Sequence, residues 1–350
     1  MSTREMSYRP LGENGPQVSA ICLGTMTVGQ QNSEADAHSQ LDLAAERGIN
    51  FIDAAEMYPV PARAETSGAT ESIVGSWLVR QARERVVIAT KVAGPARSLE
   101  WIRGGPLALD RANIRAAVEG SLRRLRTDYI DLYQLHWPAR NQPIFGQGFF
   151  DPARERECTP IRAQLEALGE LVAEGKVRRI GLSNESPWGL MEFLRIAREA
   201  GLPQVVSVQN AYSLLNRTYE FGMSEIALRE HVGLLAYSPL AFGHLSGKYL
   251  ADPAASGRLT LFQDFGVRYA KPGVQPALRA YDALARARGL SLTQLALAFV
   301  YSRWFVTSTI IGATTLAQLQ QNLDAWEVGL DADTLQAIDA LHLVHGSPAP

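Results

Sequence analysis

The chain has 350 residues, of which 46% are hydrophobic and 20% charged, so its composition is that of a globular protein and excludes wholesale disorder. The 34 Lys and Arg nearly balance the 36 Asp and Glu, so we expect neither a nucleic acid nor a membrane as a partner. Cys22 and Cys158 are too few for a disulfide scaffold or a four-thiolate zinc site, and no metal is expected. No apolar run could span a bilayer and Met1–Arg9 has no signal-peptide core, which predicts a cytoplasmic protein.

Eight short apolar segments recur along the chain. Most are continuous in Val, Ile and Leu, which indicates strands that are buried on both faces, as in a parallel sheet. The predicted strands are Ala20–Leu23, Asn50–Ala54, Val86–Lys91, Tyr129–Leu135, Arg179–Leu182, Val205–Gln209, Leu234–Tyr237 and Thr309–Ile311.

Helical patterns separate these strands. Ser33 and Asp110 each have the chemistry of an N-cap before an apolar-periodic segment, and Gly48 suits a helix end. A strand followed by a helix, eight times over, predicts an α/β fold, a (β/α)8 TIM barrel, as a single domain over residues 1–350. A doubly wound sheet is the alternative, but residues 24–29 lack the G-x-G-x-x-G spacing. The remaining predicted helices are Ile161–Ala173, Pro187–Ala200, Gly222–His231 and Leu316–Ala325.

Two additions to the barrel are predicted. A short N-terminal hairpin is expected from Tyr8-Arg9 and Gln17-Val18 around a turn at Gly12–Pro16. Three strands are followed by long βα loops, which would lie on the C-terminal face of the barrel, where active sites of this fold are found. These loops are Ala93–Asp110, Trp137–Pro160 and Leu240–Pro276.

Ionisable residues stand at the ends of three neighbouring predicted strands. Asp53 lies in the second strand with Tyr58 just beyond it, Lys91 ends the third strand, and His136 follows the fourth. Taken singly, each has an ordinary structural explanation, such as a loop cap, a packed aromatic, a surface lysine or a core histidine. Because four complementary groups would meet at one rim, the set favours a catalytic site.

This set of groups suits proton transfer to a carbonyl oxygen. A phenol with a pKa of ~10 is a weak acid near neutrality, and the nearby ammonium of Lys91 is expected to lower the pKa of Tyr58. Asp53 would keep that ammonium charged and oriented. His136 would donate a hydrogen bond to the substrate oxygen as negative charge develops there.

Eight motifs follow one another in order along nearly the whole chain: Ile21–Met26, Asn50–Tyr58, Ala89–Lys91, Asp131–Pro138, Gly181–Asn184, Gln209–Tyr212, Ala236–Leu240 and Ile311–Thr315. Together they resemble the aldo-keto reductase family, in particular its bacterial Tas-like group. The resemblance implies a catalytic tetrad of Asp, Tyr, Lys and His, which the motifs place on Asp53, Tyr58, Lys91 and His136.

The resemblance also implies NADPH in an extended pose, with the nicotinamide at the barrel centre and no Rossmann fold. Ser183, Asn184 and Gln209 would hold the carboxamide, since amide side chains offer both donors and acceptors. From the residues alone, Ser183-Asn184 is equally well explained as a helix cap before Pro187. Tyr237 would stack on the nicotinamide.

The remaining cofactor contacts are expected in the segments after the last two strands. The pyrophosphate would lie under residues 240–248, and an arginine would contact the 2′-phosphate. The resemblance places adenosine contacts just after the last strand. These residues are Ser238, Pro239, Leu240, Gly243, Gly247, Lys248, Arg258, Gly312, Thr314, Gln318 and Asn322.

The sequence thus predicts an NADPH-dependent aldo-keto reductase that reduces aldehyde or ketone carbonyls to alcohols, with Tyr58 as the proton donor. Met57 and Trp137 would line the substrate pocket. An apolar rim from the long loops would favour aldehydes and ketones over polyanions, although the same aromatics could equally pack among themselves. These aromatics are Trp101, Phe145, Phe149 and Phe150.

Two other functions are open at this point. Relatives of the family include channel β-subunits that keep the cofactor site and act mainly as partners, so a cofactor-binding redox sensor with little turnover is one alternative. A Schiff-base lyase built on Lys91 is another, but it needs a neutral lysine, whereas Asp53 and Tyr58 favour the charged form. The sequence leaves open whether the chain forms a homo-oligomer.

Overall fold

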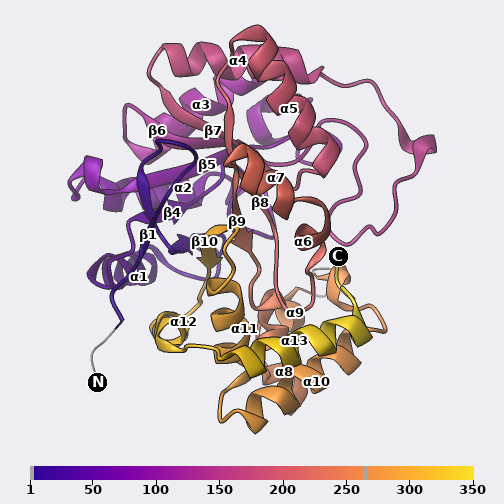
Figure 1. Cartoon of the computed structure of the whole chain (residues 1–350). Helices are drawn as coiled ribbons and strands as arrows, with labels where there is room; N and C mark the ends of the chain where they lie inside the picture. Colours follow the sequence, from indigo (N-terminus) through magenta and orange to yellow (C-terminus); the bar gives the residue numbers. More distant parts are fainter. Residues whose placement is uncertain (1–3, 263–265) are drawn as a thin grey trace.

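The computed structural model describes residues 4–262 and 266–350. Eight parallel strands close into a barrel in the order β10-β3-β4-β5-β6-β7-β8-β9 (Figure 1). This barrel confirms the predicted (β/α)8 fold and excludes the doubly wound sheet. The strands are β3 (Ile21–Gly24), β4 (Phe51–Asp53), β5 (Val87–Val92), β6 (Ile130–Leu135), β7 (Val177–Ser183), β8 (Val205–Ala211), β9 (Gly233–Tyr237) and β10 (Val306–Ile311).

All eight predicted strands are present, but two of them begin at least two residues earlier than predicted. β7 begins at Val177 and β10 at Val306, two and three residues before the predicted starts. The start of β7 was missed because Arg178 interrupts the apolar run by which strands were predicted. A charged residue is tolerated there because its side chain points outward. Its guanidinium lies 3.6 Å from the ring centroid of Tyr129 and 3.3 Å from Asp131 Oδ1.

Helices surround the barrel between the strands. The bounds of α4 and α5 match the prediction, whereas the helix expected over residues 222–231 is the shorter α7, which α6 precedes. The short helices α6, α8 and α9 and the longer α2, α10, α11 and α13 were not predicted. In α11 all residues except Gln294 are buried, so it has no polar face to create a 3.6-residue period. The helices are α1 (Glu34–Glu46), α2 (Ala69–Leu78), α3 (Arg111–Leu125), α4 (Ile161–Ala173), α5 (Pro187–Ala200), α6 (Thr218–Gly222), α7 (Ser224–Glu230), α8 (Lys248–Ala251), α9 (Arg258–Leu261), α10 (Val274–Ala287), α11 (Leu292–Tyr301), α12 (Leu316–Asp324) and α13 (Ala332–His345).

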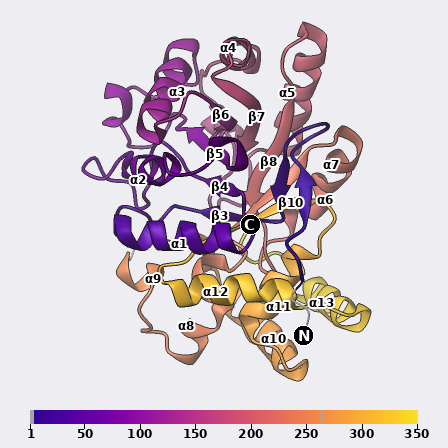
Figure 2. The same ribbon diagram turned by 90° about the vertical axis from the view of Figure 1, so that its left-hand side faces the viewer.

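The first and last helices of the ring meet. Figure 2 shows α1 and α12 side by side, although they lie at opposite ends of the sequence. Arg47, just after α1, contacts Asp324 at the end of α12 with 3.2 Å between Nη2 and Oδ1. Ser33 caps α1 and Asp110 caps α3, as predicted, because each side chain accepts a hydrogen bond from the backbone N–H three residues later.

The predicted N-terminal hairpin is present and closes the N-terminal end of the barrel. β1 (Tyr8–Pro10) pairs antiparallel with β2 (Gln17–Ser19). Leu11 and Val18 are buried and pack against Cys22 and other side chains inside the barrel. Gly12 has a φ of +75°, and a Cβ there would lie 2.6 Å from Val206 Cβ, so the turn fits against β8 only as glycine.

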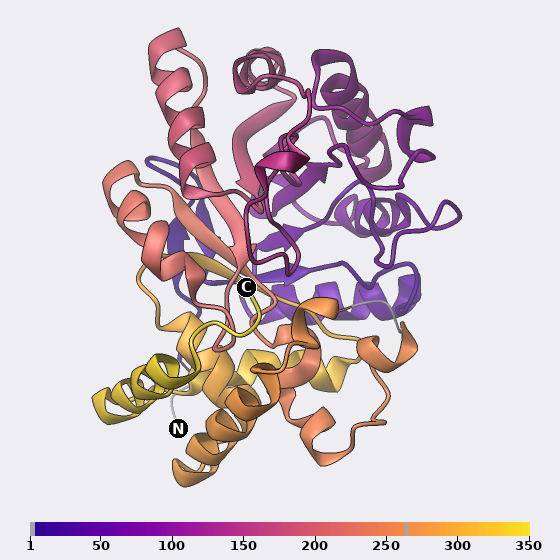
Figure 3. The ribbon, with the colours of Figure 1, turned by 90° about the vertical axis from the view of Figure 1, so that its right-hand side faces the viewer.

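The three long loops follow β5, β6 and β9, as predicted, and they contain short helical turns rather than purely irregular chain. Figure 3 shows the loop after β6 crossing in front of the barrel strands. Residues 263–265 of the third loop lie outside the described part of the chain. The turns are η2 (Ile102–Gly104), η3 (Pro152–Arg154), η4 (Ala241–Ser246) and η5 (Val267–Tyr269), and the third loop also holds α8 and α9.

Candidate active site

Lys91 lies at the centre of a hydrogen-bonded cluster at the C-terminal end of the barrel. Its Nζ is 2.6 Å from Asp53 Oδ2, 2.8 Å from Ala54 O and 3.4 Å from Tyr58 Oη. The side chain of Lys91 is fully buried. A buried ammonium is costly unless it is paired, and here all three of its donors point at oxygen atoms. The structure therefore brings three of the four predicted catalytic residues into direct contact.

The electrostatic environment keeps Lys91 charged. Burial by itself would lower the pKa of Lys91, but the Asp53 carboxylate and the Tyr58 phenol outweigh it, so the pKa of Lys91 lies above its ordinary value. A lysine that forms a Schiff base must be neutral when it attacks a carbonyl. The geometry of this site therefore opposes the lyase alternative.

The pKa of Tyr58 differs from the prediction. Lys91 does act to lower it, as expected, but burial of the phenol has the larger effect, and Asp53 adds to that effect. The pKa of Tyr58 consequently lies above its ordinary value, and the sequence-based expectation of a lowered value is wrong for the protein without bound ligand. At neutral pH Tyr58 is protonated and has a proton to donate.

His136 completes the cluster as a neutral imidazole. Its ring meets the ring of Tyr58 edge-on, with 5.6 Å between centroids. Burial, followed by the charges of Lys91 and Arg97, holds the pKa of His136 well below its ordinary value. Within residues 4–262 and 266–350, the buried Nδ1 of His136 has no hydrogen-bond partner, which is the condition of a group that awaits a ligand.

Gln134 belongs to the same network and was missed by the sequence analysis. Asp53 Oδ1 accepts hydrogen bonds from Gln209 Nε2 at 2.8 Å and from Gln134 Nε2 at 3.3 Å. Gln134 lies on β6 two residues before His136, so both point to the barrel interior. That spacing was the signal that could have identified it. Two amides thus fix the oxygen of Asp53 that Lys91 leaves free.

The residues predicted to hold the carboxamide of the cofactor lie together beside this network. Ser183 and Gln209 are paired in the register of β7 and β8, and Ser183 Oγ donates to the Gln209 carbonyl at 3.0 Å. Asn184 Nδ2 donates to the His136 carbonyl at 2.9 Å, and Asn184 Oδ1 accepts from Tyr237 Oη at 2.7 Å.

The helix-cap explanation for Ser183-Asn184 is wrong, because Ser186 caps α5 by accepting a hydrogen bond from Gly189 N. Asn184 instead has a backbone φ of +56°. Residues other than glycine adopt this conformation infrequently, and it is often found at functional sites. Neutral amides and hydroxyls at this position fit a carboxamide. Gln209 donates to Asp53 through Nε2, which leaves its Oε1 to accept a hydrogen bond from a carboxamide.

The loop after β9 carries the predicted cofactor contacts Ser238, Pro239 and Leu240 and continues into η4. Gly243 and Gly247 both have positive φ, and Lys248 Nζ donates to the Ser256 carbonyl at 3.1 Å within the same loop.

Arg258 lies in the same loop, with its guanidinium carbon 5.1 Å from the ring centroid of Phe242. Burial lowers the pKa of Arg258, and the phenol of Tyr58 acts in the opposite direction.

The predicted adenosine contacts form a separate cluster at the start of α12. Gln318 Oε1 accepts hydrogen bonds from Thr314 N and Thr314 Oγ1, both at 3.0 Å. Asn322 Nδ2 donates to the Gly312 carbonyl at 3.2 Å. The N-terminus of a helix carries unpaired N–H groups and partial positive charge, so the position suits an anionic ligand.

The expected substrate wall is only partly assembled. Met57, Tyr58 and Trp137 pack in one buried apolar cluster, and the Trp137 indole N–H donates to the Pro95 carbonyl at 2.9 Å. Phe145 meets the Trp137 ring edge-on, with 6.4 Å between centroids. The other predicted rim aromatics lie further out: the structure leaves Phe149 92% exposed, Phe150 54% and Trp101 40%.

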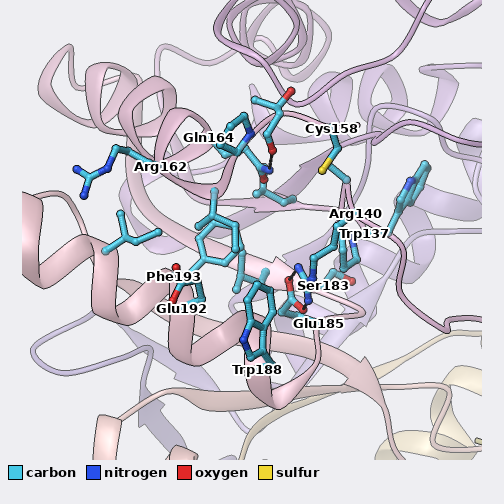
Figure 4. A pocket seen from close by; sticks show the side chains of 18 residues that line it. Trp137, Arg140, Cys158, Arg162, Gln164, Ser183, Glu185, Trp188, Glu192 and Phe193 are labelled. Carbon is cyan, nitrogen blue, oxygen red and sulfur yellow. Dashed lines mark hydrogen bonds and ion pairs between the residues drawn. The ribbon is translucent and has the colours of Figure 1, made fainter. Parts of the chain in front are cut away.

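A cavity of about 350 Å³ lies outside the barrel wall, between β6 and β7 and the helices α4 and α5 (Figure 4). Trp137 and Ser183 contribute to its lining, but none of the four predicted catalytic residues does. The Arg140–Glu185 ion pair lies at its edge. This cavity is therefore separate from the cluster around Lys91.

In the described part of the chain, no group of three or more His, Cys, Asp or Glu side chains is arranged to hold a metal ion. No helix among those same residues is long and apolar enough to cross a membrane.

Comparison with known proteins agrees with this geometry. The family model for the aldo/keto reductase family matches residues 20–342. The chain is 48% identical over 348 residues to protein tas of Escherichia coli (strain K12), covering 99% of this chain and 100% of that protein. It is 43% identical over 252 residues to an aldo-keto reductase of Babesia bovis, covering 68% of this chain and 88% of that one. It is 33% identical over 350 residues to the uncharacterized oxidoreductase YrpG of Bacillus subtilis (strain 168), covering 99% and 98%. The chain therefore belongs to the aldo/keto reductase family, and this membership supports oxidoreductase activity on small molecules.

Proposed function

We propose that this chain is an NADPH-dependent carbonyl reductase that converts aldehydes or ketones to alcohols. The observation that carries the proposal is the buried cluster in which Lys91 Nζ lies 2.6 Å from Asp53 and 3.4 Å from Tyr58, next to a neutral His136. Members of the aldo/keto reductase family generally use NAD(P)H. When bound, the cofactor supplies the hydride that is added to the carbonyl carbon.

The side chains supply the proton and stabilise the developing charge. Tyr58 gives its hydroxyl proton to the carbonyl oxygen as the carbon is reduced. Lys91 stabilises the phenolate that remains, and Asp53 holds the ammonium in place. His136 donates a hydrogen bond to the same oxygen as negative charge builds up on it.

We assign the cofactor contacts by the same reasoning. Ser183, Asn184 and Gln209 would hold the carboxamide, and Tyr237 would stack on the nicotinamide. Residues 240–248 would cover the pyrophosphate, and the cluster at the start of α12 would receive the adenosine. Arg258 would contact the 2′-phosphate.

A screen of NADPH oxidation over aldehydes, ketones and quinones, with identification of the alcohol product, tests the proposal. Carbonyl-dependent oxidation with stoichiometric alcohol supports it. Tight NADPH binding without turnover on any substrate would favour the sensor alternative. Trapping of a carbonyl compound on Lys91 by borohydride would favour the lyase.

Replacing Lys91 by Met should slow reduction and shift its pH dependence. Reduction requires protonated Tyr58, so kcat/KM is highest below the pKa of Tyr58 and falls as the pH rises through it. Without the ammonium, the pKa of Tyr58 rises further, and the alkaline limb moves to higher pH. The pH profile of kcat/KM for wild type and variant measures the shift.

Asp53→Asn is the comparison for Lys91→Met. It should move the alkaline limb in the opposite direction, to lower pH, because the Asp53 carboxylate raises the pKa of Tyr58 and the ammonium that lowers it remains. An alkaline limb at the same pH in wild type and Lys91→Met would separate Lys91 from the ionisation of Tyr58.

Arg258→Ala should weaken NADPH binding and leave NADH binding nearly unchanged. A guanidinium can form two charged hydrogen bonds to the 2′-phosphate, which NADH lacks. A charged hydrogen bond contributes about 1.5–3 kcal/mol, so the loss should be roughly 10- to 100-fold in Kd. Titration with both cofactors decides it, and an equal loss for the two, or no loss for either, contradicts the assignment.

A further inference from the structure

Arg97 places a positive charge against the expected substrate wall. It lies in the loop after β5, and its guanidinium carbon is 4.5 Å from the ring centroid of Phe145 and 5.4 Å from that of Trp137. Arg97 is an exposed residue, and the partial burial of its guanidinium lowers the pKa of Arg97, with only the phenol of Tyr237 acting in the opposite direction. No carboxylate forms an ion pair with Arg97 in the part of the chain that the structure describes.

Arg268 places a second positive charge near the same site, and this one is buried. Its side chain belongs to a residue that is only 9% exposed, and its Nη1 lies 3.5 Å from Tyr237 Oη. Over residues 4–262 and 266–350, no carboxylate lies within ion-pair distance of it. A buried charge without a counter-ion is unfavourable, so a site of this kind calls for an anion from outside the chain.

The contrast with Arg217 is informative, because the structure buries it to a similar extent. Arg217 is paired with both Glu220 and Asp339. Arg268 has no such partner among the described residues, in a protein whose total charges nearly cancel.

The Phe145-Gly146 segment lies close to both arginines. The ring of Phe145 contacts the guanidinium of Arg97, and a Cβ on Gly146 would lie 3.0 Å from Arg268 Cα. The guanidinium of Arg268 contacts Tyr237, and the charge of Arg97 acts on the pKa of His136. An anion held between them would thus lie close to the residues that act on the carbonyl group.

We propose that Arg97 and Arg268 form a subsite for a carboxylate of the substrate, so that the preferred substrates are aldehydes or ketones with an apolar body and one carboxylate. The inference rests on the proposed reductase function and specifies its substrate class. A guanidinium matches a carboxylate through two parallel hydrogen bonds, and the neighbouring Trp137 and Phe145 suit an apolar body. A cofactor phosphate could supply the same charge. The substrate is favoured because Arg97 lies on the loop that packs against Trp137, whereas the predicted phosphate contacts follow β9 and β10.

The first test compares two aldehydes that differ in charge and by one methyl group, 4-carboxybenzaldehyde and its neutral methyl ester, methyl 4-formylbenzoate. The full-length protein with NADPH should have a kcat/KM that is about 10- to 100-fold higher for the acid than for the ester. Arg97→Gln should abolish most of this preference, and Arg97→Lys should retain part of it. Arg279→Gln, at an exposed position on α10, is the matched control and should keep the wild-type ratio.

A ratio near one in the wild type, or a ratio unaffected by Arg97→Gln, overturns the subsite. Arg268→Gln should also lower the ratio. Because Arg268 is buried, its variant can fail to fold. The outcome of Arg97→Gln therefore decides the test, since Arg97 is exposed.

The second test measures binding without turnover and separates the two proposals. Benzoate should bind to the NADPH-loaded protein about 10- to 100-fold more tightly than benzamide, and Arg97→Gln should remove the difference. If neither aldehyde is reduced but benzoate binds in this Arg97-dependent way, the subsite stands and the reductase proposal fails. If benzoate binds no better than benzamide, or if Arg97→Gln weakens NADPH as much as benzoate, the substrate subsite is wrong.

Discussion

Replacing Tyr58 by Phe should leave NADPH binding intact and lower kcat for carbonyl reduction by about 10²- to 10⁴-fold, the usual contribution of a positioned general acid. The ring, which packs against His136, is kept in the variant, and only the hydroxyl that faces Lys91 is removed. The loss should therefore appear in kcat rather than in the affinity for either ligand. Steady-state kinetics together with NADPH titration measure the two effects separately.

Tyr133 offers a matched control for this variant. It is also a fully buried tyrosine, and its hydroxyl has no hydrogen-bond partner within the residues that the structure describes. Tyr133→Phe should thus leave both kcat and NADPH binding near wild type. A kcat close to wild type in Tyr58→Phe would remove Tyr58 from the proton transfer.

Replacing Arg103 by Met should destabilise the folded protein by about 3–5 kcal/mol at neutral pH, the typical cost of leaving one partner of a buried ion pair unpaired. Glu56 lies two residues before Tyr58 and is 3% exposed. Its Oε1 accepts hydrogen bonds from Arg103 Nη1 and from Ala93 N. The pair therefore links the segment that carries Tyr58 to the loop after β5. Urea unfolding of wild type and variant measures the loss.

The loss of stability in Arg103→Met should also become smaller as the pH falls. Burial raises the pKa of Glu56, and Arg103 acts against that rise, so the pKa of Glu56 increases further in the variant. A folded state that binds the proton more readily than the unfolded state loses stability as the pH rises, and regains it in acid. If the variant's loss of stability stayed constant as the pH was lowered from neutral to the ordinary pKa of a glutamate, the role given to Glu56 would be contradicted. Arg111→Met, which removes an exposed pair with Glu170, should change stability little at any pH.

The sequence predicted the barrel and the main groups of the site because both follow from position along a strand. Asp53 and Lys91 lie on strands, and His136 directly follows one, so the rule that βα units present their C-terminal ends to one face placed them together. Contacts between segments that are distant in the sequence could not be predicted in this way. Arg268 lies far along the loop after β9 and does not directly follow a strand. Its burial beside Tyr237 depends on how that long loop folds back over the C-terminal end of the barrel.

Opposing effects of similar size also limited the prediction. The sequence indicated that Lys91 would act on the pKa of Tyr58, and it does, but the sequence gives no measure of how deeply the phenol is buried. Burial decides the net direction. Gln134 was missed for another reason, since a single amide in a buried strand stands out only once the inward face of that strand is known.

The hairpin that closes the N-terminal end of the barrel covers a cysteine whose reactivity can report local unfolding. Cys22 lies beneath that hairpin, packed with Leu11 and Val18, and burial raises the pKa of its thiol well above the ordinary value. Cys158, in contrast, is exposed on the loop after β6. A thiol reagent therefore reacts at once with one cysteine per chain, and it reaches the second only when the hairpin lifts or the barrel opens. The rate at which the second thiol is labelled reports how often this end of the barrel opens in the folded protein.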